Sequence, residues 1–419
     1  MELFVMKNKT KTLRYRTMYD ALGREPVHPF PARMAPSIAI KVVGQKEKPL
    51  RVLDPMMGSG TVLALAQANG HRTFGIDIDP LAVLISKVWT RPINKDIARA
   101  EARAVLQRAK RRLRLLTSKN AYPKGSDQET RDFISYWFDP MARRQLTALV
   151  RSIEEIKDQT IKDVLMCSMS RLIITKKVGV SLAMDLSHSR PHKVFEEAPI
   201  KPFDKFISAA ERVIDNCIEK TKEKGKGKSP IVCKGDARKL PIKSGSIDLV
   251  LTSPPYLNAI DYIRCSKFSL VWMGYLISSL REVRSTSVGS ELSSDVASQD
   301  KQVIEVFKKL KITPRLSQRN EAILARYIYD MRKSVSEVAR VLDTNGRAVY
   351  VVGENMLKGT YIRNSALMKA VAEQEGLIFR EQQVRILPAN RRYLPPPTRR
   401  RAADLDVRMR REVVMTFEK

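Results

Sequence analysis

The chain holds few of the residues that build disulfide frameworks and metal sites. Of its 419 residues only four are cysteine and four are histidine, and no two cysteines have the Cys-x-x-Cys spacing. Scattered cysteines are typical of proteins in a reducing compartment and argue against a disulfide-stapled secreted domain. A metal site is disfavoured because His188 and His192, which share one loop, have no cysteine or cluster of acids beside them.

Long apolar runs are lacking too. No run approaches the roughly 20 residues that a membrane-spanning helix needs. Residues 1–7 do not have the basic-then-apolar order of a signal peptide. We therefore expect a cytoplasmic protein without a membrane partner.

Acidic residues are scarce relative to basic ones. The sequence has 76 Lys+Arg against 45 Asp+Glu, a formal net charge of +31. Such an excess favours a polyanion, above all a nucleic acid, as partner. A membrane surface attracts the same charge, but the basic residues are spread through a chain that is 43% hydrophobic and has no lipidation signal.

The most informative stretch is Asp-Leu-Val-Leu-Thr-Ser-Pro-Pro-Tyr at residues 248–256. Its apolar run predicts a strand buried on both faces of a parallel sheet. Pro254 and Pro255 end the strand, because neither can donate a backbone N–H and each fixes φ near about −65°. Ser253, the backbone carbonyls and the Tyr256 ring are thereby presented at the strand's carboxyl end, where open α/β sheets bind ligands.

A fixed set of acceptors beside an aromatic ring suits the exocyclic amine of a planar base. The amine would donate to the acceptors while the base stacks on Tyr256. The alternative is a rigid turn with a core aromatic, and the turn alone does not separate the two.

Two earlier strands also end in ligand-binding features. The strand at residues 50–54 runs into a Gly-rich turn, residues 54–61, that opens a helix and lets a ligand approach its N-terminus. The spacing matches neither Gly-x-Gly-x-x-Gly nor a triphosphate-binding loop. The next strand, residues 73–79, carries Asp77 near its end, where an acid takes ribose hydroxyls. The alternative role, a helix N-cap, suits Asp79 better because a proline follows it.

Residues 91–230 interrupt the alternation of strands and helices, and we predict that they form a basic helical insertion. A helix over residues 96–116 is crowded with arginine and faces few acids, so it is either a solvated face or a nucleic-acid contact. Further helices are expected over 133–156 and 161–174, and residues 220–228 are typical of a flexible linker. The candidate nucleic-acid contacts are Arg111, Arg112, Arg190, His192 and Lys193.

Residues 1–90 and 231–419 flank the insertion and are expected to form one α/β domain. Its last strands should pair as an antiparallel hairpin, whose basic and aromatic loop, residues 388–410, is a candidate DNA contact. Ser-rich residues 285–318 are either a mobile lid or a surface excursion. The candidate contacts in the hairpin loop are Arg391, Arg392 and Tyr393.

Taken together, Asp-Pro-x-x-Gly-Ser-Gly-Thr after one strand and Thr-Ser-Pro-Pro-Tyr after another resemble the amino-methyltransferases of DNA. These enzymes methylate cytosine N4 or adenine N6 with S-adenosylmethionine. The resemblance covers residues 27–80 and 231 to the C-terminus. It implies a Rossmann-like class I methyltransferase sheet, mostly parallel and ending in an antiparallel hairpin. It further implies double-stranded DNA with a flipped-out base as substrate, a prokaryotic, nucleoid-associated protein, and a cognate restriction enzyme as a candidate partner.

The same resemblance assigns roles to individual residues. The segment before the first strand would flank the cofactor, the Gly-rich turn would cradle its methionine part, Asp77 its ribose and Asp236 its adenine amine. Ser253, Pro254, Pro255 and Tyr256 would hold the target base. The implied cofactor-binding residues are His28, Phe30, Pro31, Ala32, Met34, Asp54, Pro55, Gly58, Ser59, Gly60, Thr61, Asp77, Ile78, Asp236 and Ala237.

The resemblance leaves the base open. In that family a serine at the position of Ser253 is more often associated with cytosine N4, and Asp or Asn with adenine N6, so N4 of cytosine is the expected target. Adenine N6, guanine N2 of RNA, and an inactive nucleic-acid-binding protein with the same sheet are the alternatives. Asp261 would either accept the released proton or cap the next helix. The insertion departs from the usual place of the target-recognition region, so its recognition role is a hypothesis.

Overall fold

The computed structural model defines most of the chain. Ala32, Arg190, Asp261, Arg391, Arg392 and Tyr393, which the sequence analysis named, lie outside the described residues. The described residues are 17–31, 33–44, 48–186, 191–220, 229–257, 262–290, 295–310, 312, 316–357, 360–386 and 411–419.

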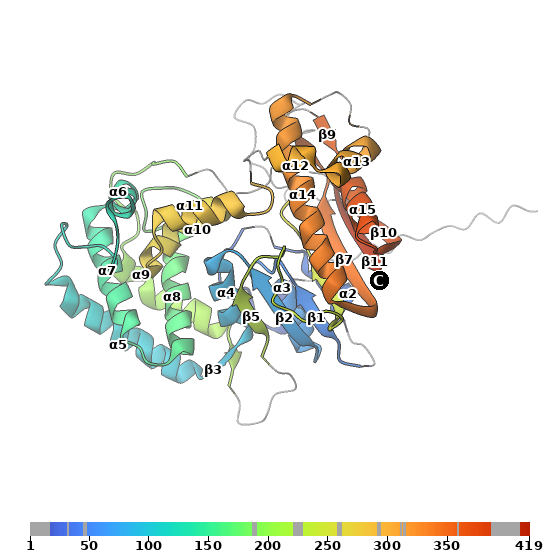
Figure 1. The fold of residues 1–419 in the computed structure, drawn as a ribbon. Helices are drawn as coiled ribbons and strands as arrows, with labels where there is room; N and C mark the ends of the chain where they lie inside the picture. The colour runs from blue at the N-terminus through green and yellow to red at the C-terminus, as the bar shows by residue number, and fades with distance from the viewer. Residues whose placement is uncertain are drawn as a thin grey trace, which may run out of the picture.

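Seven strands form one central sheet (Figure 1). They are β1 (Arg51–Asp54), β2 (Arg72–Asp77), β5 (Ile231–Lys234), β6 (Ile247–Thr252), β7 (Leu342–Gly353), β10 (Ile378–Ile386) and β11 (Arg411–Glu418). Their order across the sheet is β10-β11-β7-β6-β1-β2-β5. The five strands from β7 to β5 run parallel, whereas β11 is antiparallel to both β7 and β10. The predicted fold, a mostly parallel sheet that ends in an antiparallel hairpin, is confirmed.

Helices cover both faces of the sheet. Strand β1 shows the division, because Val52 belongs to one hydrophobic core and Leu53 to the other. The first core includes α2 (Pro36–Val43), α3 (Thr61–Ala68), α4 (Pro80–Thr90), α10 (Tyr262–Leu270), the 3-10 helix η1 (Val271–Met273) and α11 (Ile277–Thr286). The second core includes α13 (Lys301–Leu310), α14 (Gln318–Val341) and α15 (Asn364–Gln374). The remaining short elements here are α1 (Met18–Leu22), α12 (Asp295–Gln299), β8 (Asn355–Leu357) and β9 (Thr360–Ile362).

The insertion leaves and rejoins the sheet domain at one place. Its ends pair as a small parallel ladder, in which Pro92 faces Ile218 and Ile93 faces Glu219. Between β3 (Pro92–Ile93) and β4 (Ile218–Glu219) lie α5 (Lys95–Leu113), α6 (Gln128–Trp137), α7 (Pro140–Glu154), α8 (Gln159–Ile173) and α9 (Pro202–Asp215).

The prediction of a single helix over residues 133–156 is wrong, because the structure has two helices there, α6 and α7. Asp139 caps α7, accepting from the N–H groups of Met141 and Ala142 at 2.8 Å each, and Pro140 occupies the first helical turn. This Asp-Pro pair ends α6 and starts α7, as Asp79-Pro80 starts α4.

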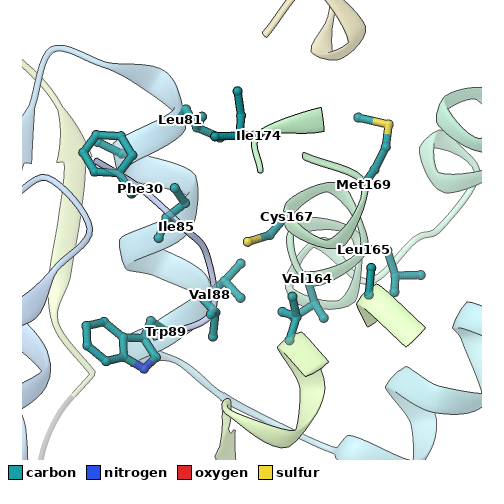
Figure 2. Close-up of a cluster of buried hydrophobic side chains, with 14 of the residues drawn as sticks. Phe30, Leu81, Ile85, Val88, Trp89, Val164, Leu165, Cys167, Met169 and Ile174 are labelled. Carbon is teal, nitrogen blue, oxygen red and sulfur yellow. The ribbon is translucent and has the colours of Figure 1, made fainter. Parts of the chain in front are cut away.

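The insertion shares a core with the sheet domain. Figure 2 shows α4 and α8 facing each other, with Ile85 and Val88 on one side and Val164 and Cys167 on the other. All four side chains are almost fully buried. Burial of this kind fixes the insertion against the helix that follows Asp77 and Asp79.

Part of the expected lid at 285–318 is a packed surface excursion. Val303 and Val306 of α13 are buried in the core that α14 and α15 form. Arg332 of α14 pairs with Asp300 at 3.1 Å, which fastens the start of α13. Within the described residues, no helix is long and apolar enough to cross a membrane.

Candidate active site

The site begins where β6 and β1 end side by side. Val52 and Leu53 of β1 pair with Leu249 and Val250 of β6. At the carboxyl end of these strands the Thr252 hydroxyl donates to Asp54 Oδ1 at 2.8 Å. The Gly-rich turn and the Ser-Pro-Pro-Tyr turn, which starts at Ser253, therefore leave the sheet from adjacent points.

Three carboxylates are gathered at this edge. Asp54 and Asp79 are buried and Asp77 is partly buried. Burial raises the pKa of Asp54 to about 7 and that of Asp79 to about 6. Burial and the neighbouring Asp79 raise the pKa of Asp77 to about 7. Such a site favours a cationic ligand, because a positive charge offsets the cost of ionising buried carboxyls.

Hydrogen-bond donors, and no ion pair within the described residues, stabilise these charges. Asp77 accepts from the N–H groups of Gly58 at 2.8 Å and Asp79 at 2.9 Å, and Asp79 accepts from Ser266 Oγ at 2.6 Å. Within the described part of the chain, no group of three or more His, Cys, Asp or Glu side chains is arranged to hold a metal ion.

The Gly-rich turn needs its glycines. Gly58 has φ of +49° and Gly60 of +82°, in the left-handed region that other residues rarely adopt. A Cβ on Gly60 would lie 2.8 Å from Ser86 Oγ, and that hydroxyl donates to the Gly58 carbonyl at 2.9 Å. The turn is thus clamped against α4.

Two hydroxyls of this turn are left without partners. Ser59 Oγ and Thr61 Oγ1 are buried and make no hydrogen bond within the described part of the chain. Buried polar atoms are normally satisfied, so these two leave donors and acceptors for a ligand in the turn.

The segment before β1 reaches the site through Phe30. Its ring stacks on Tyr262 of α10 at a centroid distance of 5.9 Å and lies 3.5 Å from where a Cβ on Gly58 would be. His28 instead is buried beside α8, with Nε2 2.9 Å from Ser170 Oγ. Burial lowers the pKa of His28 to about 3, so the ring is neutral at physiological pH. Pro31 is buried and Met34 packs against the same core.

Asp236, expected to meet the adenine amine, is held by an arginine. Arg238 donates to it through Nε at 3.0 Å and Nη2 at 2.6 Å, and through Nη1 to the buried Asp330 at 2.6 Å. Although burial raises it, the hydrogen bonds from Arg238 hold the pKa of Asp236 below its usual range. The carboxylate is therefore ionised, and its orientation is fixed. Its neighbour Ala237 is buried.

The Ser-Pro-Pro-Tyr turn is fixed from two sides. Ser253 Oγ donates to the Val351 carbonyl of β7 at 3.2 Å, and the Tyr327 phenol of α14 donates to the Pro255 carbonyl at 3.0 Å. The Tyr256 phenol oxygen lies 3.4 Å from Ser253 Oγ, and the phenol opposes the rise in the pKa of Glu412 of β11 that burial causes.

The proposed nucleic-acid contacts are not gathered at this edge. In Figure 1 helix α5 lies at the bottom of the helical group, with α6, α10 and α11 at the top. Arg112 of α5 is paired with Glu155 at 2.5 Å. At Arg112 the expectation that α5 faces few acids is therefore wrong. Arg111 is exposed. Lys193 instead lies over the ring of the exposed Tyr136 of α6, 5.5 Å from its centroid, and its neighbour His192 is also exposed.

Several residues of the site were missed by sequence reasoning. Thr252 could have been found, because it precedes Ser253 at the end of a strand. Ser266 and Tyr327 come from elements distant in the chain, and no motif marks them.

The chain is similar in sequence to several type II methyltransferases. The type II methyltransferase M.MvaI of Kocuria varians is 24% identical over 352 residues, covering 79% of this chain and 77% of the relative. M.AvaI of Nostoc sp. is 23% identical over 394 residues, with 81% and 75% covered, and M.MjaII of Methanocaldococcus jannaschii is 20% identical over 367 residues, with 68% of each covered. No family model matches the chain.

The chain is thus similar in sequence to type II DNA methyltransferases, which use S-adenosylmethionine. The residues at the sheet edge fit S-adenosylmethionine, the cofactor that the resemblance implies. The raised carboxyl pKa values of Asp54 and Asp77 suit its positive charge, and the partnerless hydroxyls of Ser59 and Thr61 suit its polar groups. The remaining methyltransferase residues expected at the cofactor, Pro55 and Ile78, follow β1 and β2 directly.

Proposed function

We propose that this methyltransferase transfers a methyl group to the exocyclic N4 amine of a flipped-out cytosine in double-stranded DNA. The observation that carries the proposal is the orientation of Ser253. Its hydroxyl has a single proton, which it donates to the Val351 carbonyl, so toward an incoming N–H the hydroxyl oxygen can only accept.

A second acceptor lies next to it. The Pro255 carbonyl is engaged by Tyr327, whereas the described residues give the Pro254 carbonyl no side-chain donor. An exocyclic amine is a poor nucleophile because its lone pair is delocalised into the base. Hydrogen bonds to Ser253 Oγ and the Pro254 carbonyl would favour a pyramidal nitrogen and direct its lone pair toward the cofactor side of the site.

Positioning then supplies much of the rate. When bound, S-adenosylmethionine supplies a methyl group on a sulfonium, which is already a good leaving group. The hydrogen bond from Thr252 to Asp54 ties the base-holding turn to the cofactor-holding turn. A shared, rigid sheet edge is what holds two reactants at about 3–3.5 Å in line.

DNA as the substrate is supported by the relatives' activity and by the charge. A base inside a duplex cannot reach Ser253, so it must rotate out of the stack and pack on an aromatic surface, here Tyr256. The net charge of +31 suits the phosphate backbone. Among the described residues, Lys193 and Arg111 are exposed candidates for contacts with the DNA backbone. The proposal therefore includes contact between the insertion and the duplex.

The test is to identify the methylated nucleoside. Purified protein is incubated with S-adenosylmethionine and unmethylated plasmid DNA, the DNA is digested, and the products are analysed by mass spectrometry. N4-methylcytosine is the expected product, and Ser253→Ala should reduce it strongly while leaving cofactor affinity unchanged. N6-methyladenine would retain the enzyme class and overturn the base. Product on RNA alone, or no product with an intact cofactor affinity, would overturn the proposal.

A further inference from the structure

The two prolines leave the Ser-Pro-Pro-Tyr turn few ways to change shape. Each ring fixes φ near about −65° and the peptide bonds are planar, so ψ is the main torsion that remains. Rotation about ψ of Pro255 swings its carbonyl and changes the direction in which Tyr256 leaves the turn. A hydrogen bond to the Pro255 carbonyl therefore restrains the step into Tyr256.

Helix α14 supplies that hydrogen bond. The phenol of Tyr327 donates to the Pro255 carbonyl at 3.0 Å, and the side chain is almost fully buried. Burial raises the pKa of Tyr327, so the phenol stays protonated and remains a donor. At the start of the turn, Ser253 Oγ donates to the Val351 carbonyl at 3.2 Å. The Pro254 carbonyl, the second proposed acceptor for the amine, lies between these two anchored points.

The helix that carries Tyr327 is itself fixed near the phenol. Asp330, in the same stretch of α14, is buried and accepts from Arg238 Nη1 at 2.6 Å and from Arg326 Nε at 3.0 Å. The backbone at Gly289 packs beside the ring, since a Cβ added there would lie 3.7 Å from Tyr327 Cδ2. The phenol therefore meets the turn from a rigid support.

We propose that Tyr327 is a positioning residue, which holds the Pro255 carbonyl so that the Pro254 carbonyl and the Tyr256 ring are placed for the target base. The inference rests on the proposed function, since both groups are assigned to the base there. A turn that is ordered before the base arrives avoids an ordering cost at the moment of binding. Loss of the Tyr327 hydroxyl would therefore slow methyl transfer and leave cofactor binding at the Gly-rich turn unchanged.

A role for Tyr327 in packing alone makes a different prediction, and Tyr350 provides the matched control. Tyr350 of β7 lies in the same hydrophobic core, is equally buried, and is in register with Thr252. Its hydroxyl has no partner among the described residues. Tyr350→Phe thus removes a buried phenol oxygen near the site without removing a hydrogen bond, and it should be neutral or stabilising.

The first measurement is the single-turnover rate of methyl transfer from labelled S-adenosylmethionine to unmethylated plasmid DNA. Tyr327→Phe keeps the ring and should lower this rate about fivefold, the effect of one lost neutral hydrogen bond. Its affinity for S-adenosylmethionine should equal that of the wild type, and Tyr350→Phe should match the wild type in both respects. An unchanged rate in Tyr327→Phe, or an equal loss in the two variants, would overturn the inference.

The second measurement observes the contact directly and needs no substrate. Pro255-Tyr256 is the only Pro-Tyr step in the sequence. Protein labelled at the proline carbonyl carbon and the tyrosine nitrogen therefore gives one carbonyl-to-amide NMR correlation, which reports on the Pro255 carbonyl. A carbonyl that loses a donor moves upfield, so the resonance should move in Tyr327→Phe and stay in place in Tyr350→Phe. An unmoved resonance in Tyr327→Phe overturns the role of Tyr327.

Together the two measurements separate this inference from the proposed function. If the wild type methylates adenine, the N4 assignment falls, and the expected loss in Tyr327→Phe is measured on that product. If the wild type transfers no methyl group to DNA although the resonance moves in Tyr327→Phe, the proposed substrate and the positioning role both fall and only the contact remains. If the wild type methylates cytosine and Tyr327→Phe is equally fast, the inference alone is overturned.

Discussion

Thr252 Oγ1 donates a 2.8 Å hydrogen bond to Asp54 Oδ1, and this contact joins the strand that carries the Ser-Pro-Pro-Tyr turn to the strand that carries the Gly-rich turn. Asp54 also accepts from the Met56 N–H at 3.2 Å. A carboxyl with a pKa of about 7 changes charge near physiological pH, and the Thr252 hydroxyl favours its ionised form. In the proposed function, cofactor binding and base positioning therefore depend on one shared group.

Thr252→Val should weaken both cofactor binding and base positioning. The change keeps the side-chain shape and removes the donor, which costs about 1–3 kcal/mol when the acceptor stays buried. We expect the affinity for S-adenosylmethionine at pH 7 to fall about tenfold, measured by calorimetry, because a larger fraction of Asp54 is protonated. Thr73→Val is the control. Thr73 is equally buried, and its hydroxyl has no partner among the described residues, so its loss should be neutral or stabilising.

The pH dependence of cofactor binding should follow the three acids. Asp54 and Asp77 have pKa values of about 7 and Asp79 of about 6, all raised. A cation prefers the ionised carboxylates, so affinity should rise as pH goes from about 5.5 to 8. S-adenosylhomocysteine, which lacks the sulfonium charge, should show a shallower rise. Asp77→Asn should flatten the profile, and an unchanged profile in this variant would contradict the assignment.

The stability of the protein without cofactor should change in the opposite direction. A carboxyl whose pKa is higher in the folded than in the unfolded state stabilises the fold below its unfolded pKa, near 4, and loses that contribution as pH rises through the folded value. The contribution of these three acids to the free energy of unfolding should therefore decline between about pH 4 and 7. Thermal melts at a series of pH values, with and without cofactor, measure both trends, and the cofactor's protection should be greatest at the high end.

Gly60→Ala should damage the cofactor turn beyond the cost of its backbone conformation. Gly60 has φ of +82° and Gly70 of +79°, so an alanine at either pays a similar left-handed penalty of about 1–2 kcal/mol. Only at Gly60 does the new Cβ meet an atom, Ser86 Oγ at 2.8 Å, whereas at Gly70 nothing lies within 4 Å. Gly70→Ala should bind cofactor normally and melt slightly earlier. Gly60→Ala should lose cofactor affinity as well, and equal affinities in the two variants would contradict the role of the turn.

The sheet and its two turns were accessible from sequence because local signals fix them. Pro254 and Pro255 end a strand whatever surrounds them, and the Asp79-Pro80 pair marks a helix start. The expected hairpin at the C-terminus also formed: β10 is long but polar and largely exposed, whereas β11 buries Val413, Met415 and Phe417.

What sequence reasoning missed depends on contacts between distant segments. The basic charge of α5 pointed to an exposed polyanion-binding face, yet Glu155 of α7 is brought beside Arg112 only when the helices pack. Tyr327 lies in an ordinary helix, and its hydrogen bond to the Pro255 carbonyl forms only when α14 packs beside the turn. Such pairs carry no local pattern, so the chain must be folded before they can be recognised.

Salt dependence should show which basic residues touch DNA. Each phosphate contact contributes roughly one unit to the slope of log affinity against log salt concentration. Arg111→Ala and Lys193→Ala should each lower the slope by about one, measured by fluorescence anisotropy on duplex DNA. Arg112→Ala should lower it less, because Arg112 is already paired with Glu155. Lys369→Ala, on α15, is the control and should leave the slope unchanged. If neither Arg111→Ala nor Lys193→Ala alters it, the duplex binds elsewhere on the protein.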